Sequence, residues 1–160
     1  MIAHARCLED RILGCAFLGL ITGKENTYFE RCFEKLGCPK EERGLIPDAP
    51  CTSGFIHLMM DTARGGDLGE MLSVLVVCEW SYGSWGRRVL GATKRDDFMC
   101  YEWVDLHSGE GFEAVVTYLR KLLDKEGNLI DEEGKKRCKK RFLQAIQLEE
   151  DFFENAYLKK

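Results

Sequence analysis

All three prolines of this 160-residue chain lie between Pro39 and Pro50, so the stretches on either side contain none. Because proline breaks helices, both stretches are free to form long helices. Apolar residues recur in them at helical spacing, and the sequence has no alternating pattern of the kind that predicts strands. The sequence therefore predicts an all-α protein, and its length fits a single domain over residues 1–160.

Glycines and polar residues mark the expected ends of the helices. Gly37 and the segment from Pro39 to Pro50 form the longest predicted loop. Gly65 and Gly66 end one helix, and Asp67 is a suitable N-cap for the next. The expected helices cover residues 8–22, 25–37, 53–64, 67–90, 97–106, 110–125 and 132–158.

Charge and hydropathy exclude several classes of partner. The net charge is −4, and the basic cluster at residues 135–141 is better interpreted as a solvated helix face than as a phosphate-binding patch. The apolar stretch at residues 12–21 is too short to span a bilayer, and acidic residues precede it, unlike in a signal sequence. We expect a cytoplasmic protein that binds neither nucleic acid nor membrane.

The eight cysteines contain no C-x-x-C pair and have no histidine at ligand spacing. A zinc site is therefore not expected. Several of the cysteines lie among apolar residues of expected helices, where a free thiol behaves as a small hydrophobic group. The chain also lacks the short, loop-rich character of disulfide scaffolds. We expect reduced thiols and neither a metal nor another cofactor.

The helix expected over residues 67–90 places a thiol and a phenol on one face. Cys78 lies one turn before Tyr82, and Glu79 adjoins the thiol. On this helix alone, Cys78 is more simply interpreted as a core residue than as a nucleophile. The predicted inward seam of the helix consists of Leu68, Met71, Leu72, Leu75, Cys78, Tyr82, Trp85 and Val89.

The last expected helix carries a carboxylate at a core position. Glu149 has apolar residues one turn away on either side. A buried carboxylate is costly unless it is paired, and burial shifts its pKa upward, as a general acid requires. The alternative is a glutamate at the edge of the apolar stripe that reaches solvent.

Four segments, in order between residues 52 and 157, resemble the thiaminase II (TenA) family. Cys-Glu-Trp-Ser-Tyr-Gly-Ser-Trp-Gly at residues 78–86 resembles the family's cysteine-bearing helix. Thr-Ser-Gly-Phe-Ile-His-Leu at 52–58 is similar to its Thr-x-Ala-Tyr-x-x-Leu segment, and Tyr-Glu-Trp-Val-Asp at 101–105 to its Tyr-x-x-Trp-Ile segment. Residues 149–157 resemble its C-terminal Glu-x-x-Phe-Trp-x-x-Ala-Tyr segment, with Phe153 in place of tryptophan.

The resemblance implies a haem-oxygenase-like helical bundle, shortened at its N-terminus, that forms homo-oligomers. Family members hydrolyse an aminomethyl-pyrimidine with release of ammonia, or cleave thiamine, so the implied partner is a small pyrimidine or thiamine-derived substrate. A thiolate can add to an electron-poor pyrimidine, and a carboxylic acid can protonate the departing group. The resemblance implies that Cys78 is the nucleophile, Glu149 the acid and base, and Tyr82, Phe55, His107 and Glu79 substrate contacts.

Three features depart from the family pattern. The family holds the pyrimidine nitrogens with an N-terminal aspartate in a Gln-Asp-Tyr context, which we expect this chain to lack, and Asp10 is no credible replacement. Phe55 stands where the family has tyrosine, so the ring is kept without its hydroxyl. His107 stands where the family has a pocket tyrosine, and a histidine in solvent at a helix end is an equal alternative there. A non-catalytic pyrimidine-binding or scaffold protein, and a chain that has lost its first helices, therefore remain open as hypotheses.

Overall fold

Every regular element in the computed structural model, which describes residues 1–158, is a helix, as the sequence predicts. None of the helices in this range is long and apolar enough to cross a membrane. The α-helices are α1 (Leu8–Leu20), α2 (Asn26–Lys35), α3 (Lys40–Arg43), α4 (Pro50–Gly65), α5 (Leu68–Val89), α6 (Phe98–Leu106), α7 (Glu110–Gly127) and α8 (Glu132–Leu158). Short helical turns η1 (Ile2–His4), η2 (Ile21–Glu25) and η3 (Leu90–Ala92) complete the order.

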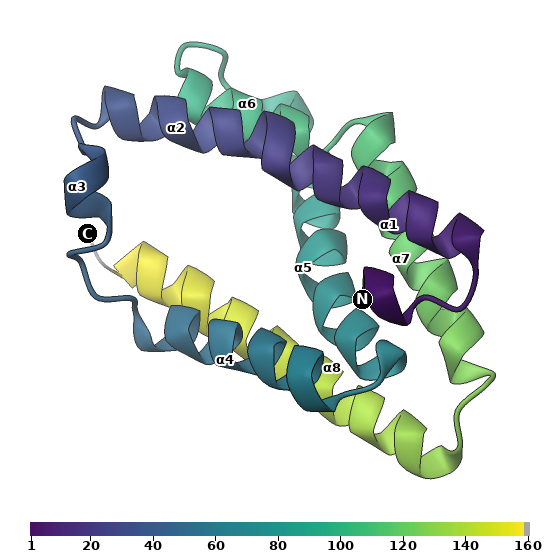
Figure 1. Ribbon diagram of the computed structural model, residues 1–160. Helices are drawn as coiled ribbons and strands as arrows, with labels where there is room; N and C mark the ends of the chain where they lie inside the picture. Colours follow the sequence, from purple (N-terminus) through teal and green to yellow (C-terminus); the bar gives the residue numbers. More distant parts are fainter. Residues whose placement is uncertain (159–160) are drawn as a thin grey trace.

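Helix α5 lies in the middle of the bundle, with α7 on one side and the α4–α8 pair on the other (Figure 1). It is therefore buried on two faces, whereas the sequence predicted one inward seam that ended at Val89, which is 40% exposed. A helix between two layers needs apolar residues on both sides. The prediction assumed a single apolar stripe and therefore missed the second buried face of α5. One core cluster joins Leu68, Leu72 and Val76 to Leu119 and Leu122, and the other joins Val74 and Val77 to Leu58 and Ala145.

The first turn of α5 is fixed to α8 by polar contacts. The Asp67 side chain accepts a hydrogen bond from the Glu70 backbone N–H at 2.9 Å, which confirms the predicted N-cap. The buried Glu70 carboxylate accepts from Arg137 Nε at 3.0 Å and from Arg141 Nε at 3.1 Å. Two residues of the basic cluster thus hold α8 along α5 and set the crossing of these helices.

The predicted helix boundaries were wrong in three places. The expected loop between Pro39 and Pro50 contains the short helix α3, and α4 begins at Pro50 rather than at residue 53. Proline is well suited to a first helical turn because the N–H that it lacks has no helical partner there. The helices expected over 8–22 and 25–37 are also not separated, because η2 is a π-helical turn that joins α1 to α2. Figure 1 shows α1 and α2 as one continuous line across the bundle.

Hydrogen bonds and ion pairs join the N-terminal segment to α7. Arg6 makes two hydrogen bonds of 2.8 Å to the carboxylate of Glu126, which is 1% exposed. Lys125 Nζ lies 2.6 Å from the Asp10 carboxylate, and the Tyr118 hydroxyl donates to the Asp10 carbonyl at 2.8 Å. Asp10 therefore anchors α1 to α7.

Candidate active site

Three polar side chains meet between α5 and α8. Cys78 and Tyr82 lie one turn apart on α5, and Glu149 lies on α8. Glu149 is 9% exposed, which confirms its predicted core position. Hydrogen bonding from the Cys78 and Tyr82 side chains lowers the pKa of its carboxyl group, and Cys78 Sγ also donates to the Val74 carbonyl oxygen at 3.8 Å. These two partners explain how the carboxylate can be buried, because each provides a hydrogen that an ionised carboxylate can accept.

Burial and negative charge keep the thiol of Cys78 protonated. Burial raises the pKa of Cys78 far above its ordinary value, and the charges of Glu149 and Glu79 raise it further. The pKa of the Tyr82 phenol is also raised, first by burial and then by the charge of Glu149. Burial raises the pKa of Glu149 as well, although its hydrogen bonds with Cys78 and Tyr82 oppose that shift. The resting site is thus a protonated thiol beside a carboxyl group whose pKa is also raised.

A second set of polar side chains, made up of Glu79, Glu25 and His107, adjoins the set of Cys78, Tyr82 and Glu149. Burial raises the pKa of Glu79 to about 7, and the negative charges of Glu25 and Glu149 add to the shift. His107, at the C-terminal end of α6, is 6% exposed. Its Nδ1 lies 2.7 Å from the Trp103 carbonyl oxygen, and its Nε2 lies 4.0 Å from Glu25 Oε1. Glu25 belongs to η2, and nothing in the sequence pattern had marked it.

His107 is buried because a glycine on α5 lets the end of α6 approach closely. A Cβ atom on Gly86 would lie 2.7 Å from the His107 carbonyl oxygen, too close for any side chain. The alternative of a histidine in solvent is therefore wrong. The imidazole stacks on Trp103 with ring centroids 4.5 Å apart and lies 5.4 Å from the Tyr82 ring. Aromatic packing thus connects the two polar groups and holds the Tyr82 ring in place.

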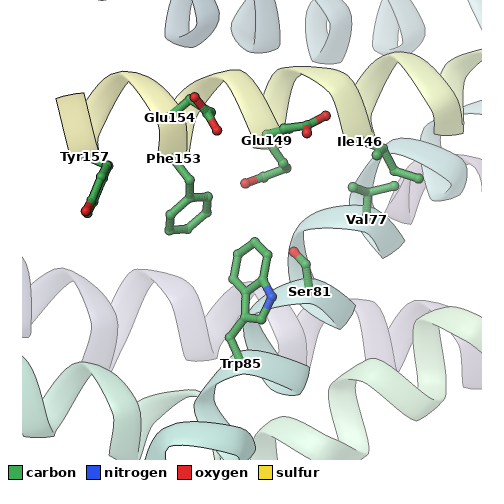
Figure 2. A pocket seen from close by; sticks show the side chains of 9 residues that line it. Val77, Ser81, Trp85, Ile146, Glu149, Phe153, Glu154 and Tyr157 are labelled. Atoms are coloured by element: carbon green, nitrogen blue, oxygen red, sulfur yellow. The ribbon is translucent and has the colours of Figure 1, made fainter.

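An open pocket of about 580 Å³ lies beside Glu149, between α5 and α8. In Figure 2 the indole of Trp85 from α5 and the ring of Phe153 from α8 meet at the pocket, and Glu149 extends from α8 toward α5. The Trp85 and Phe153 ring centroids are 4.5 Å apart. The volume falls in the range of small-molecule sites. Glu149 is the predicted site residue that lines this pocket, so it links the pocket to the thiol behind it.

Phe55, the remaining predicted contact, is half-buried on α4. Its ring packs against the core cluster formed by Leu58, Val74, Val77 and Ala145. Its position on α4 explains this placement, because α4 packs against α8 and α5. Within residues 1–158, no group of three or more His, Cys, Asp or Glu side chains is arranged to hold a metal ion.

The fold and the site together define a helical-bundle protein in which a cysteine, a tyrosine and a glutamate from two crossing helices meet beside a small pocket. Over residues 3–160 the chain matches the TENA/THI-4/PQQC family, and it belongs to this family. The predicted family resemblance is thereby confirmed.

Two known proteins are similar to the chain. The aminopyrimidine aminohydrolase of Halalkalibacterium halodurans is 28% identical over 125 residues, which cover 78% of this chain and 56% of that protein. The chain thus spans little more than half the length of this relative. The crystal structure of a TenA family transcription regulator from Silicibacter sp. TM1040 superposes with a TM-score of 0.79 at 17% identity, over 96% of this chain and 70% of that one. This second likeness shows that the chain has the fold of a TenA family protein.

Proposed function

We propose that the protein hydrolyses aminopyrimidines, converting an aminomethyl-pyrimidine into hydroxymethyl-pyrimidine and ammonia in thiamine salvage. The observation that carries this proposal is the contact of the Cys78 thiol with the Glu149 carboxylate beside an open pocket. The relative named as an aminopyrimidine aminohydrolase supports the same reaction class. Cleavage of thiamine itself needs the same two groups and is the nearest variant of this function.

The reaction requires a base that touches the thiol, since burial keeps Cys78 protonated. Glu149 takes the thiol proton as the sulfur adds to an electron-poor carbon of the pyrimidine ring. Glu149 then gives this proton to the amine, the C–N bond breaks, and ammonia leaves. Water adds to the exocyclic carbon and passes a proton to Glu149. The C–S bond breaks last, and the thiol recovers its proton from Glu149.

Tyr82 orients the carboxyl group during these transfers. Its side-chain hydrogen bond with Glu149 lowers the pKa of that carboxyl group against the effect of burial. The phenol itself stays protonated, because burial and the charge of Glu149 raise its pKa. Tyr82 is therefore a lasting hydrogen-bond donor that fixes one oxygen of Glu149 and leaves the other for the thiol, the amine and water.

The test is turnover by the purified protein. Ammonia and hydroxymethyl-pyrimidine should appear when aminomethyl-pyrimidine is added, and Cys78→Ala should abolish both. Cys138→Ala is the matched control, because it also removes a buried thiol, and Cys138 lines a different cavity at the other end of α8. Equal rates for wild type and Cys78→Ala would overturn the proposal.

A second function, binding of a pyrimidine without catalysis, is favoured by one observation. The raised pKa of Cys78 means that the free protein holds a thiol rather than the thiolate that reacts. Isothermal titration calorimetry separates the two functions. Tight binding of hydroxymethyl-pyrimidine with no turnover of aminomethyl-pyrimidine supports the binding protein, whereas turnover supports the enzyme.

Exposed apolar residues support self-association. Leu8 and Ile12 lie one turn apart on α1, and their side chains are 67% and 59% exposed. Exposed apolar surface of this kind is typical of protein–protein contacts. Sedimentation of wild type and an Ile12→Glu variant tests the oligomer, and a monomeric wild type would contradict self-association.

The protein's eight cysteines are all free, which supports a reducing, cytoplasmic setting.

A further inference from the structure

A thiol and an amine from distant parts of the chain meet where α1 begins. Cys7 is the N-cap residue of α1, and Lys125 lies in the last turn of α7. Lys125 Nζ is 3.7 Å from Cys7 Sγ, although the two residues are 118 positions apart in the sequence. Neither side chain belongs to the candidate active site, so the proposed reaction gives this pair no task.

One carboxylate oxygen brings the two groups together. The Cys7 thiol donates to Asp10 Oδ2 at 3.0 Å, and Lys125 Nζ donates to the same oxygen at 2.6 Å. The Asp10 side chain is only 15% exposed, and the Tyr118 hydroxyl donates to the Asp10 backbone carbonyl at 2.8 Å. Because both donors converge on one well-held acceptor, the sulfur and the nitrogen stay close to each other.

Sulfur and nitrogen in such contact are a pair that oxidation can join. A peroxide converts an accessible cysteine into a sulfenic acid, which condenses with a neighbouring thiol or nitrogen. Cys7 is half-buried, so a molecule as small as hydrogen peroxide can reach its sulfur. The nitrogen of Lys125 is then the nucleophile that already lies beside the oxidised sulfur.

We propose that Cys7 and Lys125 form a reversible oxidative cross-link, a sulfenamide in which Sγ of Cys7 is bonded to Nζ of Lys125. Hydrogen peroxide is the oxidant: its O–O bond breaks, an S–O bond forms, and the thiol proton leaves in a molecule of water. The Lys125 ammonium group then releases a proton to solvent, and the free amine attacks the sulfur. The S–O bond breaks as the S–N bond forms, and the hydroxyl group leaves with one amine hydrogen as a second water.

Thiols reverse the cross-link. A first thiol attacks the sulfur of Cys7, and its hydrogen goes to the departing amine of Lys125. A second thiol then reduces the mixed disulfide and restores the Cys7 thiol. The eight cysteines of the resting protein are free, so the reduced pair is the state from which peroxide starts the cycle.

The cross-link ties the start of α1 to the end of α7 by a covalent bond. A cross-link restricts the unfolded chain, and its effect grows with the length of the loop that it closes. The loop between Cys7 and Lys125 comprises most of the chain. We therefore expect the melting temperature of the linked protein to rise by at least about 5 °C.

Peptide mapping of the whole protein after treatment with hydrogen peroxide tests this assignment. Trypsin does not cleave after a modified lysine, so digestion without reductant should give residues 7–11 joined to residues 122–135. The mass of the joined pair should be the sum of the two peptides less two hydrogens. Lys125→Arg keeps a cation beside Asp10 but removes the amine, so it should give no joined pair. Lys121→Arg, at an exposed position one turn earlier on α7, is the matched control and should still form the cross-link.

The outcomes are distinct. A joined pair that forms in wild type and in Lys121→Arg, is absent from Lys125→Arg and disappears with dithiothreitol supports the cross-link. Recovery of Cys7 as a sulfinic acid or in a disulfide, with trypsin still cleaving after Lys125, would overturn it. A linked protein that melts at the temperature of the reduced protein would contradict the stabilising effect. None of these measurements involves a pyrimidine, so they decide this inference independently of the proposed function.

Discussion

Glu149 on α8 lies close enough to Cys78 and Tyr82 on α5 for hydrogen bonding from both to lower the pKa of its carboxyl group, so this carboxyl group connects the two helices at the candidate active site. The same helices are tied at the other end of the crossing by Glu70 with Arg137 and Arg141. The contacts of Glu70 with the two arginines fix α8 against α5. Glu149 can therefore stay beside the Cys78 thiol although the Glu149 side chain also lines an open pocket. Precise placement of this kind is what proton transfer between neighbouring groups requires.

The first prediction concerns the acid–base role of Glu149. Glu149→Gln keeps the size of the side chain but can neither take the Cys78 proton nor return it. Removing a general acid–base lowers turnover by roughly 10²- to 10⁴-fold, and we expect a loss in this range for ammonia release. Asp151→Asn, two residues further on an exposed face, should keep the wild-type rate. A Glu149→Gln variant with more than half of the wild-type rate would show that another group moves the proton.

The second prediction uses two glycines of α5 one turn apart. A Cβ on Gly86 would lie 2.7 Å from the His107 carbonyl oxygen, so Gly86→Ala forces α5 and the end of α6 apart. We expect it to lower the free energy of unfolding by about 2–3 kcal/mol, as overpacking of a core does. At Gly83 the nearest atoms, on Phe112 and Val116, would be 3.4 Å away, so Gly83→Ala should change stability by less than about 1 kcal/mol. Urea denaturation of both variants measures the difference, and equal stabilities would contradict the close approach.

Most of the fold follows from the sequence, because proline placement and helical periodicity are local signals. The N-cap at Asp67 is set by neighbouring residues and is found where the sequence predicts it. The second buried face of α5 was missed, because it exists only through α7 packing from the far side. The π-helical turn η2 was missed as well, since no local pattern separates it from a short break between helices.

The sequence predicts a site residue correctly where the residue type does not fit its apolar surroundings. Glu149 stood out as a carboxylate within an apolar stripe, and its burial is confirmed. Glu25 carries no such signal, because a glutamate beside Lys24 at a helix junction is typical of a solvated surface. Its closeness to His107 arises from the packing of separate helices, which local periodicity does not reveal. The lining of the pocket by Trp85 and Phe153 depends on the angle at which α5 and α8 cross.

The third prediction concerns the N-terminal anchor. Arg6→Met removes the cation that pairs with the buried Glu126 carboxylate through two hydrogen bonds of 2.8 Å. Removing one partner of a buried ion pair costs about 3–5 kcal/mol, and because Arg6 itself is half exposed we expect the free energy of unfolding to fall by about 3 kcal/mol. Lys121→Met, at an exposed position of the same helix, is the control. Adding Glu126→Gln to Arg6→Met should recover part of the loss, and a strictly additive double variant would show that the two residues do not interact.

The last prediction is a dependence of stability on pH that comes from Glu79. Burial raises the pKa of Glu79 from its ordinary 4.5 to about 7, so between these pH values the folded protein holds a proton that the unfolded chain has released. Stability therefore falls as the pH rises through this interval, by about 2–3 kcal/mol at roughly 1.4 kcal/mol per unit of pKa. Glu79→Gln removes this titration, so the variant should gain stability relative to wild type as the pH rises from 5 to 8. The raised pKa of Glu149 has the same sign and remains in both proteins, which makes the difference between them the quantity to measure. Urea denaturation at a series of pH values measures this difference in the free energy of unfolding. If the free energies of the two proteins change with pH in parallel, Glu79 is solvated and ionised throughout.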